Sequence, residues 1–477
     1  MNTVTKSFFF KIKLLCLICF VISIGICFRL ANIQADAVGG GFIEARDEGT
    51  YSYTARNFYL YGKWRTDGVD FGTIMPVYPP LQLIGLYLFG LHNYSFRFTN
   101  LFFSIITPII LYFFLKKYLG QKVAFIGFIS LFLNFFYLAF VRSGLPEVTM
   151  VFFFLLTLIC LTNTVLAKKN FFLNGLVTGV FLMLTFFTKQ SSSALIGLIF
   201  LSYLIFYLKE KRLKKYLLSF TGTTIAILTS LCSYYFFVFK PNQDIWTTIY
   251  EGTIGGNHPT GSILLPINFI GQIKNFIFGP QWFYSPALTI GLIIYLFFFF
   301  KKRGLKKLKT VESLSLLFLL LFFFQMVLVP NLTARFFILA IVPMTIIFAS
   351  LFKKQIFVLL IGIDIIFNIF FCYKYFVKEA KFNYLNSSKK LSQIINKKIK
   401  GRWSVLWIMN DSFNNINIFT YPRDDKTYSN YFNRYGWPKY FSMTKQEVEE
   451  YKVMTPKFFS RLEYVSKIDD QSIFKLK

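Results

Sequence analysis

Long apolar stretches alternate with short polar segments along most of the chain. An apolar run begins at Phe8 and ends near Phe28. Ten more apolar stretches follow it, at residues 96–115, 121–141, 147–166, 171–187, 194–208, 216–238, 286–300, 312–329, 336–352 and 355–376. A bilayer core about 30 Å thick needs roughly 20 apolar residues for each helical span. The pattern therefore predicts an all-α polytopic membrane protein with about eleven transmembrane helices.

The first apolar run has two interpretations. Lys6, Lys11 and Lys13 precede its most apolar part, from about Leu14 to Phe28, and Ala35-Asp36-Ala37 follows it, which is the order of features in a secretory signal peptide with its cleavage site. The alternative is a retained first helix. We favour the retained helix because the apolar run already begins at Phe8 and is long enough to span the membrane.

Two longer polar segments, 31–95 and 239–285, interrupt the apolar pattern. Within the first of them, the apolar piece 81–91 is too brief to cross a bilayer, and it is typical of a re-entrant or interfacial helix. The two segments form the large loops of a transmembrane domain that we place at residues 1–377.

The last hundred residues, 378–477, contain no apolar stretch of spanning length. Short strand-like pieces at 404–408 and 416–421 predict strands, and the Lys/Glu-rich segment 445–452 predicts a helix. The segment is therefore expected to form a small α+β domain outside the membrane.

Basic residues favour one side of this arrangement. With the N-terminus in the cytoplasm, every basic cluster between spans falls on the cytoplasmic side, as the positive-inside rule requires: Lys116-Lys117, Lys168-Lys169, Lys209–Lys215, Lys301–Lys309 and Lys353-Lys354. The loops 31–95 and 239–285 and the tail 378–477 then lie outside. High Phe, Ile, Lys and Asn contents indicate an AT-rich genome, hence a bacterial inner (plasma) membrane.

Composition supports the membrane assignment and excludes other classes. Of 477 residues, 55% are hydrophobic and only 16% are charged, against about 25% charged residues in soluble domains. The net charge of +30 does not indicate a nucleic-acid partner, because the clusters lie between spans, where they face lipid headgroups. All six cysteines lie inside apolar spans and only two histidines are present, so neither a disulfide framework nor a zinc site is indicated.

Charged residues recur at the outer ends of the predicted spans. They are Asp47-Glu48, Glu147 after the turn Arg142–Pro146, Lys189 and Arg335. A carboxylate can accept a proton from an attacking hydroxyl, and Lys and Arg can stabilise a leaving phosphate. The pattern is thus suited to group transfer from a phosphate-linked donor.

Plainer explanations exist for each of these charges. Acidic residues in outer loops are often only solvated, Glu147 after a proline suits a helix start, and Lys189 and Arg335 can extend to lipid headgroups. Asp47 and Glu147 could instead hold a divalent cation. Asp364 lies within a span, where a carboxylate is costly, and Asn368 one turn later is its expected partner.

The segment 47–64, Asp-Glu-Gly-Thr-Tyr-Ser-Tyr-Thr-Ala-Arg-Asn-Phe-Tyr-Leu-Tyr-Gly-Lys-Trp, resembles the first-loop signature of the protein O-mannosyltransferase and aminoarabinose (lipid A) transferase families. In that signature Asp-Glu is followed by Tyr, then Ala-Arg, then Gly-x-Trp. Further resemblances cover roughly residues 1–350: Tyr78-Pro79-Pro80, Phe96-Arg97-Phe98, Thr188-Lys189 and Arg335-Phe336-Phe337 with Pro343. Glu147 stands where these families often have Asp, and Tyr78 stands where they often have charged residues.

The resemblance implies the C-type glycosyltransferase fold, a polyprenyl- or dolichyl-phosphate sugar donor, and Asp47 as the general base. Glu48 and Glu147 would complete the catalytic group, while Arg56, Lys189 and Arg335 would bind the donor phosphate. Three residues are expected at the acceptor side: Tyr51, Tyr78 and His258.

The predicted function is inverting transfer of a sugar from a polyprenyl-phosphate donor to a hydroxyl of a glycan, lipid or protein acceptor at the outer membrane face. The sequence leaves two other classes open. A transporter or flippase for a lipid-linked precursor would need charges along a midplane path, whereas most charges here lie at one face. A non-catalytic scaffold would act through the tail 378–477.

Overall fold

The structure is a computed structural model, and most of the predicted spans lie within the part of the chain that it describes. The described residues are 19–36, 47–62, 64, 75–243, 270–271, 273–274, 282, 285–298, 300, 309–328, 334–352, 358–382, 403–405, 440–468 and 471–477. The predicted strand at 416–421 and His258 lie outside them.

Helices make up almost all of the described chain up to Lys378. In chain order they are the first helix (Cys19–Leu30), α2 (Asp47–Tyr61), α4 (Tyr78–Phe89), α5 (Asn93–Tyr118), α6 (Gln121–Phe132), α7 (Phe135–Val141), α8 (Glu147–Leu166), α9 (Phe171–Thr188), α10 (Ala194–Glu210), α11 (Leu213–Tyr234), α14 (Pro286–Phe298), α15 (Thr310–Leu328), α16 (Ile341–Leu351) and α17 (Val358–Tyr373). Short 3₁₀ or π segments extend this set: η1 (Gln190–Ser192), η2 (Tyr235–Phe239), η3 (Lys240–Asn242), η8 (Ala334–Ala340) and η10 (Lys374–Lys378).

The prediction of a polytopic helical membrane protein is confirmed. Among the described residues, seven helices are long and apolar enough to cross a membrane, or eight if the bent pair α6–α7 is one span. Three shorter apolar helices accompany them: Cys19–Leu30, Pro286–Phe298 and Phe337–Leu351. A total of eleven requires all three of these to cross, and that number remains a prediction.

One predicted span is not a continuous helix. The stretch 121–141 breaks between α6 and α7, and the two helices are bent by 53°. Asn134 lies at the break as the N-cap of α7, where its side-chain oxygen accepts a hydrogen bond from the Tyr137 amide at 2.9 Å. Such a cap satisfies a backbone donor that the interrupted helix leaves without a partner. An asparagine in an apolar run is the sequence feature that marks the break.

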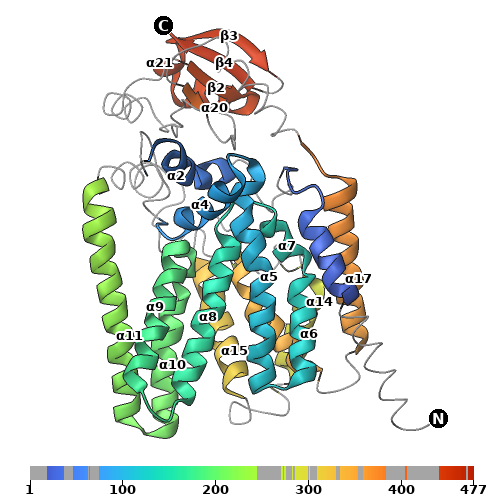
Figure 1. Cartoon of the computed structure of the whole chain (residues 1–477), viewed down its shortest axis with the longest axis vertical. Coiled ribbons are helices and arrows are strands. Elements are labelled where there is room, and N and C mark those ends of the chain that lie inside the picture. Colours follow the sequence, from blue (N-terminus) through green and yellow to red (C-terminus); the bar gives the residue numbers. More distant parts are fainter. Residues whose placement is uncertain are drawn as a thin grey trace, which may run out of the picture.

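In the described part of the polar segment 31–95, the chain forms the helices α2 and α4. Figure 1 shows α2 and α4 lying across one end of the bundle, between the transmembrane helices and the C-terminal sheet. We refer to this as the capped end. Gly85 permits α4 to approach α5 closely, because an added Cβ there would lie only 2.1 Å from the Ser95 carbonyl oxygen. Residues 81–89 of the short apolar piece 81–91 thus belong to a helix of 12 residues at the capped end.

Glycines also bring α9 and α11 together. A Cβ at Gly175 would lie 2.1 Å from the Ser219 carbonyl oxygen, and one at Gly222 would lie 2.2 Å from that of Phe172. Thr223 reinforces the contact by donating to the Gly175 carbonyl at 2.9 Å. Small residues and interhelical hydrogen bonds are the usual basis of helix association in lipid, where no hydrophobic effect drives it.

A Gly175→Ala variant is expected to unfold at a clearly lower temperature, because the added methyl group forces the backbones of α9 and α11 apart. The matched control is Gly197→Ala in α10, where the nearest atom to an added Cβ is a Leu321 side-chain carbon at 3.9 Å. Thermal unfolding of the detergent-solubilised variants measures the difference. Equal midpoints for the two variants would contradict this account of the α9–α11 contact.

The tail forms the predicted small α+β unit. Its four-stranded sheet has the order β1-β2-β4-β3, with strands Trp403–Val405 (β1), Tyr440–Thr444 (β2), Leu462–Ile468 (β3) and Gln471–Leu476 (β4). The β1–β2 pair is parallel and the other two pairs are antiparallel. Helices α20 (Lys445–Met454) and α21 (Pro456–Phe459) accompany it, and the first confirms the helix predicted at 445–452.

Candidate functional site

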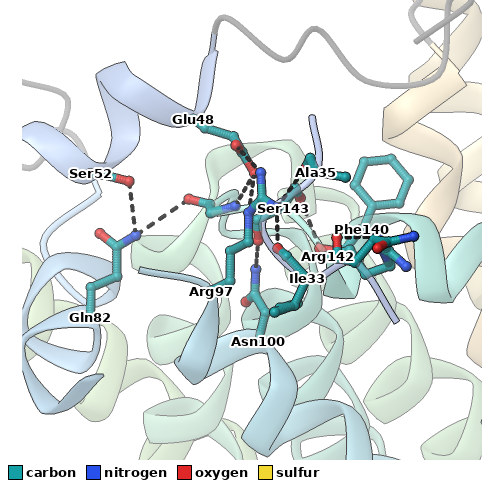
Figure 2. A network of polar contacts seen from close by, with 12 residues as sticks. Ile33, Ala35, Glu48, Ser52, Gln82, Arg97, Asn100, Phe140, Arg142 and Ser143 are labelled. Atoms are coloured by element: carbon teal, nitrogen blue, oxygen red, sulfur yellow. Dashed lines mark hydrogen bonds and ion pairs between the residues drawn. The ribbon is translucent and has the colours of Figure 1, made fainter. Parts of the chain in front are cut away.

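An ion pair between Glu48 and Arg97 lies at the centre of the capped end. Two guanidinium nitrogens of Arg97 donate to the two carboxylate oxygens of Glu48, at 3.1 and 2.6 Å. The Gly144 amide donates to the same carboxylate at 2.6 Å. Both side chains are almost fully buried, at 2% and 4% exposure. The first turn of α2 is therefore fixed to α5 and to the turn before α8, as Figure 2 shows.

Two arginines hold the chain that leaves the first helix. Arg97 also donates to the carbonyls of Ile33 and Ala35, at 2.5 and 2.6 Å. Arg142 donates to the carbonyl of Asn32 at 2.7 Å, and its guanidinium lies 4.4 Å from the centre of the Phe376 ring. Carbonyls at the C-terminal end of a helix attract cations, so the arginines dock the end of the first helix against the site.

Amide side chains shape the turn between α7 and α8. Asn100 donates to the carbonyls of Ser143 and Leu145, both at 2.6 Å. Gln82 of α4 donates to the Gly144 carbonyl at 3.3 Å and lies 3.4 Å from the Ser52 hydroxyl of α2. The turn that presents its amide to Glu48 is thus held from both α4 and α5 (Figure 2).

A second buried ion pair joins Glu147 to Lys189. Glu147 begins α8 and Lys189 follows the last residue of α9, so the pair links two neighbouring helices. The Lys189 ammonium also lies 5.7 Å from the centre of the Tyr51 ring of α2. The structure therefore brings together Tyr51, Glu147 and Lys189, which the sequence assigned to three different parts of the site.

Tyr78 begins α4 and its side chain is fully buried among these groups. Burial raises the pKa of the Tyr78 phenol well above its ordinary value, and the carboxylates of Glu147 and Glu48 act in the same direction. The amides of Gln82 and Asn100 oppose this rise only in part. The phenol is therefore neutral near pH 7 and cannot serve as a base there.

Of the remaining predicted site residues, the structure describes the side chains of some and not of others. Arg56 is buried within α2, and Arg335 is half-buried in η8. Asp47 is the first residue of α2, but its side chain lies outside the described part of the chain. The same holds for the whole of His258.

Three residues of the observed site were absent from the predicted set: Arg97, Gln82 and Asn100. Arg97 was noted only within a resembling motif, and the amides were not noted at all. The sequence feature that could have identified them is their position. Each is a polar residue within one or two turns of the start of an apolar helix. A polar side chain there is costly in lipid unless it has a partner.

The described residues do not favour a metal site. They contain no group of three His, Cys, Asp or Glu side chains arranged to bind a metal ion. Glu147, one of the two predicted ligands, forms an ion pair with the Lys189 ammonium, and the side chain of Asp47, the other, lies outside the described part of the chain.

Residues 75–235 match the family model described as dolichyl-phosphate-mannose-protein mannosyltransferase. This is about a third of the chain, and it includes Tyr78, Arg97, Glu147 and Lys189. No curated protein matches the chain in a sequence search.

Solved structures identify the fold. The whole described arrangement matches the fold of the C-type membrane glycosyltransferases, as the sequence resemblance implied. One match is ArnT from Cupriavidus metallidurans bound to undecaprenyl phosphate, with a TM-score of 0.65 and 10% identity, covering 96% of this chain and 97% of that one. The structure of ArnT from the same organism in the apo state has a TM-score of 0.66 and 11% identity, covering 97% of this chain and 98% of that one. The apo oligosaccharyltransferase of Archaeoglobus fulgidus has a TM-score of 0.50 and 12% identity, covering 93% of this chain and 71% of that one.

Proposed function

We propose that the chain is a glycosyltransferase that moves a sugar from a polyprenyl-phosphate donor to an acceptor hydroxyl. The observation that carries this proposal is the pairing of two buried carboxylates with two cations at one end of the bundle: Glu48 with Arg97, and Glu147 with Lys189. The fold is shared with ArnT, a protein whose structure holds undecaprenyl phosphate. The match of residues 75–235 to a mannosyltransferase family supports the same class.

In this proposal Asp47 is the general base. The carboxylate of Asp47 takes the proton of the acceptor hydroxyl as its oxygen forms a bond to the anomeric carbon of the sugar. The bond between that carbon and the phosphate oxygen breaks, and its electron pair leaves with the polyprenyl phosphate. A single displacement of this kind inverts the anomeric configuration. Glu48 already accepts three hydrogen bonds, and in this proposal it anchors α2 rather than taking the proton.

Positive charge for the leaving phosphate would come from Lys189 and Arg335. Glu147 holds the Lys189 side chain in a buried position, where a fixed charge stabilises a developing anion better than a solvated one does. Arg335 follows from the resemblance and lies half-buried in η8. Arg56, within α2, is the third proposed contact of the phosphate. Tyr51, Tyr78 and His258 stay assigned to the acceptor side.

The capped end would face outward from an inner (plasma) membrane, with the N-terminus in the cytoplasm. Basic residues at the opposite end of the bundle support this orientation: Lys116 and Lys117 lie in the last turn of α5, and Lys209 lies in the last turn of α10. Clusters of this kind remain in the cytoplasm. The acceptor is a glycan, a lipid or a protein on the outer side, and residues 1–377 and 378–477 are the proposed domains.

The test is an assay in detergent. Lipid extracts of cells that lack the chain supply the accumulated polyprenyl-phosphate sugar, and purified protein is added with a cell-envelope fraction as acceptor. Release of free polyprenyl phosphate, measured by mass spectrometry, is expected with the intact chain. A flippase has no second membrane face in detergent and would release none, so the absence of product would overturn the proposal in favour of transport.

A further inference from the structure

A polar network lies inside the bundle where α17 crosses the break between α6 and α7. Asn368 donates to the side-chain oxygen of Asp364 at 2.9 Å, both residues being in α17 and almost fully buried. The hydroxyl of Ser130 in α6 lies near the same carboxyl group but forms no hydrogen bond of normal geometry with it. The predicted Asp364–Asn368 pair is thereby confirmed, and it extends to a neighbouring helix.

The network caps the start of α7 from a different helix. The side-chain oxygen of Asn368 accepts a hydrogen bond from the Phe135 amide at 2.7 Å. Asn134 accepts from the Tyr137 amide and donates to the Ser285 hydroxyl at 2.8 Å. Two of the backbone donors that the break exposes are thus satisfied by side chains, one of them from α17. In lipid no water is present to satisfy a free amide, so α17 fixes where α7 begins.

The far end of α7 leads directly into the site. The helix has seven residues, and the turn that follows it gives the Gly144 amide to Glu48. Asn100 holds the same turn through the carbonyls of Ser143 and Leu145. A short helix capped at one end and clamped at the other transmits a displacement along its length. Helix α7 and the first residues of the turn are all that separate the Asn368 contact at Phe135 from the Gly144 amide.

The surroundings of the Asp364 carboxyl disfavour its charged form. No described cation forms an ion pair with it, and its second oxygen makes no hydrogen bond of normal geometry within the described chain. A charged carboxylate in such a place is expensive, whereas a protonated one can donate to Ser130 and still accept from Asn368. An asparagine side chain has nearly the same shape as a protonated aspartic acid. Like that acid, it offers one acceptor oxygen and one donor group.

We propose that Asp364 and Asn368 are positioning residues for the transfer reaction, acting through α7 on the Gly144 amide that holds Glu48. The inference rests on the proposed function for its catalytic consequence, but the mechanical link between α17 and the turn stands apart from it. Neither residue touches the reacting groups.

The experiment combines activity with amide exchange in four variants. Asn368→Ala and Asp364→Ala are expected to lower sugar transfer on the order of 10- to 100-fold, as misplacement of a site by a distant change can do. Asp364→Asn is expected to retain wild-type transfer, because it reproduces the neutral acid. Ile366→Ala, on the exposed face of the same helix, is the matched control and should leave transfer unchanged.

Hydrogen–deuterium exchange of peptides covering residues 135–147 provides the readout that does not need activity. Faster exchange in Asn368→Ala and Asp364→Ala, with wild-type exchange in the other two, supports the proposal. Unchanged exchange in Asn368→Ala would overturn the link through α7, even if transfer fell. Loss of transfer in Asp364→Asn would overturn the neutral role. If the wild-type chain transferred no sugar, the proposed function would fail, while exchange would still decide whether α17 positions the turn.

Discussion

Replacing Asp47 by Asn is expected to reduce sugar transfer by about 10²- to 10⁴-fold, the usual contribution of a general base. The amide has the size of the carboxylate but cannot take the proton of the acceptor hydroxyl. Because Glu48 fixes the first turn of α2 through Arg97 and Gly144, the exchange of one oxygen for nitrogen at the preceding residue leaves that anchor in place. The protein should insert and unfold as the wild type does.

Cells with the Asp47→Asn chain should accumulate one polyprenyl-phosphate sugar, which mass spectrometry of lipid extracts would detect and identify. Asp67→Asn in the same polar segment is the control, and it should leave the lipid profile unchanged. An Asp47→Asn protein that is stably inserted and transfers sugar at the wild-type rate would contradict the assignment of Asp47 as the general base. Equal accumulation in both variants would instead point to a general charge requirement of the segment.

An Arg97→Ala chain is expected to lose about 3–5 kcal/mol of unfolding free energy, because it leaves the Glu48 carboxylate buried without its cation. The carbonyls of Ile33 and Ala35 lose their donor in the same variant. Transfer should fall to background, since α2 is no longer fixed to α5. Thermal unfolding of the solubilised protein and the detergent assay measure the two effects.

The double variant Glu48→Gln/Arg97→Ala makes this prediction specific. It contains no unpaired buried charge, so it should be more stable than Arg97→Ala alone, although it carries one more substitution. Its transfer should stay at background because the anchor is still missing. Lys452→Ala breaks an exposed pair with Glu449 and should change stability little. A double variant less stable than Arg97→Ala would argue against a charge-based role for the pair.

The membrane spans could be predicted because length and hydropathy decide them directly. The pair Asp364–Asn368 was also predictable, since residues four apart in a helix share a face. The helix α2 was not predicted, because its sequence is neither strongly apolar nor clearly amphipathic. Its position depends on Arg97, a residue 49 positions from Glu48, and no local pattern encodes that contact.

The candidate site was predicted in part. The sequence placed Glu147 and Lys189 at the same face of the membrane, but it could not show that they pair with each other. Three of the four described strands, β2, β3 and β4, were also missed, although only two residues, Asp469 and Asp470, separate β3 from β4. That spacing is a hairpin signal. Contacts between distant segments, rather than local propensities, account for most of what the sequence left open.

The docking of the first helix has a consequence for how the chain assembles during synthesis. The carbonyls of Asn32, Ile33 and Ala35 meet Arg97 and Arg142, so the first helix gains its polar partners once the chain up to the start of α8 is in the bilayer. Asn32 also donates to the carbonyl of Phe376, which the ribosome adds more than 300 residues later. The catalytic end can therefore assemble around the earliest helices, and the last one closes the bundle against the first.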